Sequence, residues 1–162
     1  MWAAHADNRE TVKAILKFQP TEQLMAQSLN RHNAMHVAIH HVQLDVLLLL
    51  MEVAAECGIL NDVLNMRNRP RHGGRITLLH QPAQTKGAEG IMKMFIERHG
   101  DLLLNVTPPV VHTAVRNSRP GVVQLLLDAY GDCLPGRSSL ADVTARAAIK
   151  SQPRTQIMIL LL

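Results

Sequence analysis

A short box that starts a helix recurs along the chain, and an aliphatic run follows each copy. The boxes are NAMHVAI at 33–39, TLLHQPA at 77–83 and PVVHTAV at 109–115. The runs begin within about a dozen residues of the boxes, at 46–50, 91–96 and 122–127. A repeated unit of this kind buries its apolar face only against its neighbours. The pattern therefore predicts a stack of repeats and argues against a fold built around one central core.

The histidines of the boxes give the period of the repeat. His36 and His80 are 44 residues apart, and His80 and His112 are 32 residues apart. A period of about 33 residues with a Thr-Pro-Leu-His-x-Ala box is typical of ankyrin repeats, and the chain resembles that family over nearly its whole length. The resemblance implies an all-α, ankyrin-like solenoid of stacked helix-turn-helix repeats. We expect one such domain, part of a longer protein, with approximate repeats at 1–30, 31–74, 75–106, 107–139 and 140–162.

The chain departs from the family pattern at the ends of the first helices. Gly87 matches the glycine that usually ends this helix, whereas Val42 and Ser118 stand in the other places. Pro82 lies inside the expected first helix of the third repeat. A proline there removes a backbone hydrogen bond and clashes with the preceding turn, at a cost of about 3 kcal/mol. We therefore expect this helix to start late or to be distorted.

The buried layers must be built almost without aromatic side chains. Aromatic residues make up 2% of the chain and apolar residues 47%, so Leu, Val, Ile, Met and Ala have to fill the interior. Alternation of the strand type is scarce, which favours helices. Equivalent inner positions of successive first helices are predicted for Ala3, Ala38, Ala83, Ala114 and Ala147. The leucines predicted to be buried between repeats are Leu16, Leu49 and Leu126.

The spacing between the second and third boxes exceeds a standard repeat by roughly ten residues. Residues 52–57 continue the helical pattern, and residues 61–65 could form a further turn. Insertions in repeat proteins often lie on the binding face. Neutral drift accounts for the extra length equally well.

The positive charge is concentrated in the segment that joins these two repeats. The net charge is +4, and residues 67–75 contain four arginines and no acidic residue. Pro70 and the glycines at 73–74 disfavour a helix and predict an exposed turn, or finger. Arginines on such a turn attract carboxylates, phosphates or an acidic protein surface. The competing interpretation is a solvated loop that only keeps the stack soluble.

The histidines and cysteines do not predict a metal site or an active site. His36 and His40 have the spacing of two metal ligands on one helix, but the Glu of a zinc-protease motif is missing. The resemblance implies instead that the histidines of the three boxes bond backbone at the turn and tie adjacent repeats together. Cys57 and Cys133 match no metal spacing. The chain also contains no nucleophile elbow and no phosphate-binding glycine loop, so we expect neither a cofactor nor an enzyme.

The cellular setting follows from absences in the sequence. No run of eighteen apolar residues predicts a membrane span, and the start does not have the pattern of a signal segment. Two separated cysteines indicate a reducing compartment. We expect a cytoplasmic protein, with the nucleus as the alternative.

Protein–protein recognition is the function that this architecture predicts. The partner, which we expect to present an acidic surface or segment, would bind the concave groove of turns and first helices. The candidate contacts are Arg67, Arg69, Arg71, Arg75, His40, His41, Gln84, Thr85, Lys86, Arg116 and Asn117. The alternative function is an anion-binding module for nucleic acid or an acidic phospholipid headgroup through the finger at 67–75. Scarce aromatic platforms and the modest net charge argue against nucleic acid. A structural spacer is the third interpretation.

Overall fold

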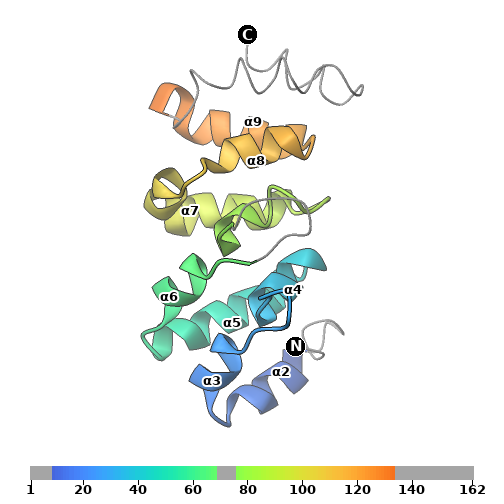
Figure 1. The fold of residues 1–162 in the computed structure, drawn as a ribbon, viewed down its shortest axis with the longest axis vertical. Coiled ribbons are helices and arrows are strands. Elements are labelled where there is room, and N and C mark those ends of the chain that lie inside the picture. The colour runs from blue at the N-terminus through green and yellow to red at the C-terminus, as the bar shows by residue number, and fades with distance from the viewer. Residues whose placement is uncertain (1–8, 69–75, 134–162) are drawn as a thin grey trace. The chain divides into compact units, whose positions relative to one another are not determined.

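The computed structural model describes residues 9–68 and 76–133, and these residues are organised as helices joined by turns (Figure 1). Within those ranges the β-type pairing is one isolated antiparallel bridge, between Arg67 and Thr77. The all-α prediction is therefore confirmed. The chain divides into two compact units, with the boundary between Gln81 and Pro82. The fifth expected repeat lies outside the described residues, and the repeat boundaries stay a prediction.

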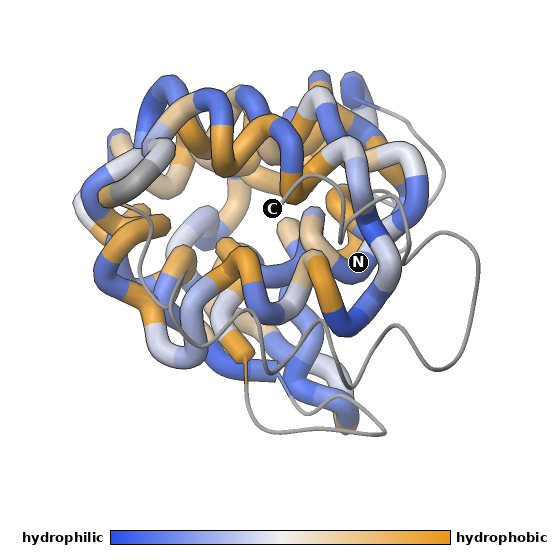
Figure 2. Tube along the Cα trace, turned by 90° about the horizontal axis from the view of Figure 1, so that it is seen from above, coloured by the Kyte–Doolittle hydropathy of each residue, from blue (hydrophilic) through white to orange (hydrophobic). Residues whose placement is uncertain are grey.

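The first unit is built around a long apolar helix, α5. Its helices are α2 (Arg9–Leu16), α3 (Pro20–Met25), α4 (Ala34–His40), α5 (Leu44–Glu56), α6 (Leu60–Asn65) and the 3-10 turn η1 (Leu78–His80). Helices α2, α3, α4 and α6 all pack against α5. Leu16 and Leu49 are buried, as predicted. Hydrophobic residues are interspersed with hydrophilic ones along the described trace (Figure 2).

The second unit is centred on helix α9. Its elements are α7 (Glu89–Asn105), α8 (Val110–Arg116), α9 (Pro120–Tyr130) and the 3-10 turn η2 (Gly131–Cys133). Helix α9 packs against both α7 and α8. Leu126 on α9 is buried, which confirms its prediction, and Phe95 on α7 has no exposed surface. Because the unit holds so few aromatic side chains, aliphatic residues supply the rest of its interior.

Two first helices end in a left-handed residue that is not glycine. Val42 follows α4 with φ 58°, and Ser118 follows α8 with φ 53°. In each case the next backbone N–H closes the helix end: Gln43 donates to the carbonyl of Ala38 at 2.9 Å, and Arg119 donates to that of Ala114 at 3.0 Å. These are the long bonds of a Schellman cap, which needs a residue at positive φ. The turn geometry is therefore kept where the sequence lacks the glycine.

The first helix of the third box is distorted, as Pro82 predicts. It consists of the three-residue turn η1, and irregular turns follow up to the start of α7 at Glu89. Ala83 nevertheless has no exposed surface, like Ala38 and Ala114 in the other boxes. All three alanines are buried, and their equivalence as inner positions of successive first helices stays a prediction. The other two, Ala3 and Ala147, lie outside the described residues.

A short helix follows the long apolar helix between the second and third boxes, and similar short segments recur along the chain. Helices α3 and α6 begin at Pro20 and Leu60, and α7 breaks at His99, which has φ −138° and ψ 32°, so that a new segment begins at Gly100. These starts are 40 residues apart. The side chain of Asn65 donates to the carbonyl of Asn61 at 3.0 Å, and Asn105 bonds Asp101 in the same way at 2.8 Å. The further turn predicted at 61–65 is confirmed.

Candidate partner-binding surface

Acidic residues are absent from the parts of the chain that form the first helices and their turns. The segments 23–44, 63–88 and 102–127 contain no Asp or Glu, but eight Lys or Arg residues and seven of the nine histidines. All acidic residues of the described ranges lie on other helices, so that α4, η1 and α8 carry none. A segment of this composition attracts anions. The separation is visible in the sequence, although motif reasoning did not find it.

The buried histidines of the first two boxes hold the starts of their helices. Asn33 caps α4: its Oδ1 accepts the N–H of His36 at 3.0 Å and lies 2.7 Å from Nδ1 of the His36 ring. The Asn33 N–H lies 3.4 Å from the same ring nitrogen, which completes a capping box. In the next box the hydroxyl of Thr77 lies 2.8 Å from Nδ1 of His80. The predicted backbone bond at the turn is present for His36.

His36 is held in its neutral form. It is 1% exposed, its Nε2 has no hydrogen-bond partner, and its ring stacks on His32 with centroids 5.4 Å apart. Burial, and secondarily the neighbouring His32, lowers the pKa of His36 to about 3. A charged His36 would have to stay buried beside another imidazole. The role of this residue is therefore structural.

The end of α4 presents two of the predicted contact residues to solvent. His40 and His41 are both exposed, and their rings meet edge to face with centroids 5.1 Å apart. They directly precede Val42, the left-handed residue of the turn. The Schellman cap thus fixes the backbone that carries both imidazoles.

The arginine-rich segment is fixed at its base. Arg67 is exposed and forms the antiparallel bridge with Thr77, and the N–H of Asn68 donates to the carbonyl of Ile76 at 3.0 Å. The side chain of Asn68 is buried and donates to Oε1 of Gln81 at 3.2 Å. The residues on either side of 69–75 are therefore hydrogen-bonded to each other. The remaining predicted arginines, Arg69, Arg71 and Arg75, lie outside the described residues.

In the second unit, one arginine joins two of the predicted contact segments. Arg119, at the start of α9, donates from Nε at 3.3 Å and from Nη2 at 2.9 Å to the carbonyl oxygen of Gln84. This clamp holds the loop with Lys86 against the turn that carries Arg116 and Asn117. Lys86, Arg116 and Asn117 are all exposed. They form what we call the clamp surface.

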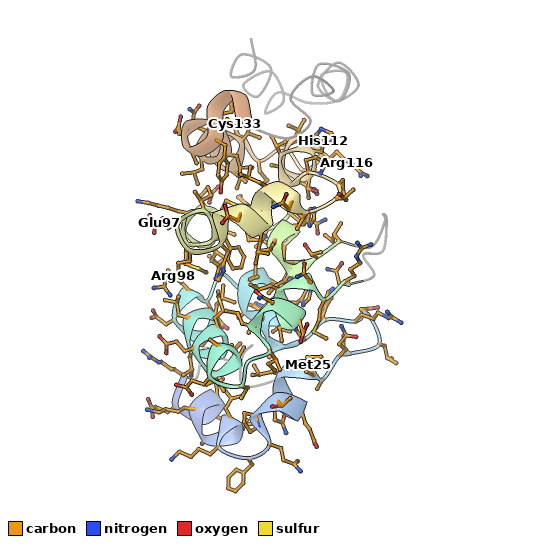
Figure 3. All side chains as sticks on the ribbon, turned by 90° about the vertical axis from the view of Figure 1, so that its left-hand side faces the viewer. Met25, Glu97, Arg98, His112, Arg116 and Cys133 are labelled. Atoms are coloured by element: carbon orange, nitrogen blue, oxygen red, sulfur yellow. The ribbon has the colours of Figure 1, made fainter. Side chains whose placement is uncertain are left out.

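The two cations of the clamp surface are exposed and form no ion pair with a described residue. Within the described ranges the ion pair is Lys93 with Glu97, at 4.0 Å on α7, so that Lys86 and Arg116 are in none. Arg116 lies one helical turn from His112 on α8 (Figure 3). Thr85 differs from the other predicted contacts because it is only 9% exposed.

The described residues contain no group of three or more His, Cys, Asp or Glu side chains arranged to hold a metal ion. Among the helices of these residues, none combines the length and the apolar character needed to cross a membrane. No protein-family model, curated protein or solved structure matches the chain significantly. The function has to be inferred from the surface itself.

Proposed function

We propose that the chain is a protein-recognition module of ankyrin-like helix pairs, and that it binds an acidic segment of a partner protein through its first helices and the turns after them. The observation that carries the proposal is the separation of charge. The three segments that form these helices and turns contain eight basic residues and no acid. Helices α4 and α8 and the turn η1 carry no Asp or Glu, and Glu89 at the start of α7 lies beside Gly121 on α9.

Local geometry supports the ankyrin-like assignment. The pairs α4–α5 and α8–α9 each consist of a seven-residue helix, a turn through a left-handed residue and a longer apolar helix. Both helices of a pair pack together. Two of the boxes also use a polar residue and the box histidine, three positions later, to hold the start of the helix. The short helices α3 and α6, and the segment of α7 after His99, depart from the two helices of an ankyrin repeat.

Binding would use a surface that is already ordered. The Arg119 clamp and the Schellman cap at Ser118 fix the backbone beside Lys86 and Arg116 before any partner arrives. Pre-organisation of this kind reduces the entropy lost on association. Exposed cations mainly speed the encounter with an acidic partner and select against basic ones. The module would bind its partner without converting it.

The same proposal puts the protein in the cytoplasm or the nucleus. Cys57 and Cys133 belong to different units and are free thiols. Free cysteines, one of them exposed, are common in compartments that keep thiols reduced.

A pair of double variants tests the proposal. Lys86→Ser with Arg116→Ser removes two charges from the clamp surface, and the matched control, Lys93→Ser with Arg98→Ser, removes two exposed charges from α7. Binding is measured by fluorescence anisotropy with a library of labelled Glu-rich peptides and the same peptides with Gln in place of Glu.

The wild type should prefer the Glu peptides, and this preference should fall as salt is raised. We expect the first variant to bind them about fivefold to tenfold more weakly and the control to bind them like the wild type. Equal losses in both variants would mean that only net charge matters. Binding of RNA and phosphatidylserine vesicles, but of no peptide, would favour the anion-binding function instead.

A further inference from the structure

A tight turn precedes α4 and is closed by several hydrogen bonds. The N–H of Arg31 donates to the carbonyl of Ser28 at 2.8 Å, and the N–H of Ser28 donates to the carbonyl of His32 at 2.9 Å. The Ser28 hydroxyl accepts the N–H of His32 at 3.2 Å, and the Gln27 side chain donates to the carbonyl of Arg31 at 3.3 Å. We call residues 27–32 the Leu29 turn.

The Leu29 turn is attached directly to the buried part of the first unit. His32, at its end, stacks on the buried ring of His36, with an angle of 4° between the two planes. The next residue, Asn33, caps α4, and its Nδ2 lies 3.4 Å from the sulfur of Met66. Both the position and the conformation of the turn are therefore set by the fold.

The tip of this turn carries an apolar side chain without any cover. Leu29 is 102% exposed, the largest value among the exposed large hydrophobic residues of the described ranges. Arg31, two positions further on, is also exposed and has φ 58°. The segment 23–44 around them contains no acidic residue. An exposed apolar residue and an exposed cation thus stand two positions apart on one hydrogen-bonded turn.

We propose that Leu29 and Arg31 form an anchor for the partner protein, and that the partner's acidic segment carries an apolar residue or socket next to a carboxylate. The inference rests on the proposed function and adds the apolar requirement to it. Burial of one leucine side chain is enough to change an affinity about tenfold or more. Because the turn is already hydrogen-bonded, little of that gain is lost to ordering the loop.

The composition of the Leu29 turn favours a protein over a lipid surface. Recognition of anionic lipids usually takes clusters of four to eight Lys or Arg residues, and a single acyl chain gives only marginal membrane binding. One leucine and one arginine fall far below both requirements. A turn with a fixed shape also increases affinity only for a partner of complementary shape, which a protein offers and a lipid surface does not.

The test compares Leu29→Ser with Phe18→Ser in the full chain. Phe18 is the matched control because it is also an apolar residue outside a helix and is 75% exposed. The probes are Glu-rich peptides with one Leu and the same peptides with Ser in its place. Thermal unfolding should be unchanged in both variants, since neither side chain is buried.

The wild type should bind the Leu-containing peptides about tenfold more tightly than the Ser-containing ones. Leu29→Ser should abolish this difference, and Phe18→Ser should keep it. Lack of the difference in the wild type, or its loss in both variants, would overturn the inference while binding of acidic peptides still supports the proposed function. Loss of the Glu-over-Gln preference would mark failure of the proposed function itself. Binding of phosphatidylserine vesicles that only Leu29→Ser removes would identify a lipid surface and overturn the anchor.

Discussion

Acid should destabilise the first unit, and His36 should be the main cause. Its pKa falls from the ordinary 6.5 to about 3 in the fold because the ring is buried and stacked on His32. Between these two pH values His36 is protonated in the unfolded chain and neutral in the folded unit. The free energy of unfolding is therefore unaffected by this histidine above pH 6.5, and it declines as the pH falls toward 3.

The size of the effect follows from the two pKa values. The full difference of about 3.5 pKa units corresponds to about 5 kcal/mol. At pH 5 about 2 kcal/mol of this should be lost. The pKa values of His32, in the same unit, and of His99, in the second unit, are also lowered, mainly by burial, and each adds a loss of the same sign to its own unit. A variant is needed to separate His36 from them.

His36→Gln removes the titration and keeps the capping box, since Gln suits the third position of the helix. Urea unfolding followed by ellipticity at 222 nm, at pH 7.5 and pH 5, should give the wild type a loss about 2 kcal/mol larger than that of the variant. Equal losses would refute the reasoning. If the variant does not fold, an NMR titration of the wild-type imidazole decides: a midpoint near 6.5 contradicts the burial argument.

Two further predictions concern stability. Val42→Gly should raise the free energy of unfolding by up to about 1 kcal/mol, because glycine adopts the left-handed φ of 58° without the strain of a β-branched residue. Urea melts should show this gain. A loss of stability would mean that the contacts of the exposed valine contribute more than its strain costs. Leu49→Ala should cost about 2–5 kcal/mol, since the side chain is only 6% exposed. Hydrogen exchange should show that loss in α5 and not in α8–α9, and a uniform loss over both units would contradict the local coupling expected of repeats.

Much of the helical pattern was predictable because it depends on local chemistry. The boxes at His36 and His112 predict the helices α4 and α8, and Pro82 predicts that the helix of its box is shortened to the turn η1. The positions of Val42 and Ser118 also followed from the period, although neither residue favours a positive φ. Here the two packed helices of a pair, and not the residue itself, impose the turn.

The recurrence of the third helix could not be predicted in the same way. Helices α3 and α6 contain six residues each, too few to show a clear period. They exist because Leu24 and Val63 find a buried surface on the unit, which no local pattern reveals. The clamp surface depends on Arg119, a residue that sequence reasoning did not single out. Its bond to the Gln84 carbonyl joins positions 35 residues apart.

The stretch around η1 has a mechanical consequence. An α-helix resists extension through its ladder of backbone hydrogen bonds, and among the described residues between Asn65 and Glu89 the helical structure is the three-residue η1. The chain also passes from one compact unit to the other at Gln81–Pro82. When the protein is pulled from its ends, residues 82–88, which form turns and no helix, should lengthen before the helices on either side of them. Gln84, whose carbonyl accepts the bonds of Arg119, lies within these residues, so tension on the chain should act on the Arg119 clamp before it acts on the helices.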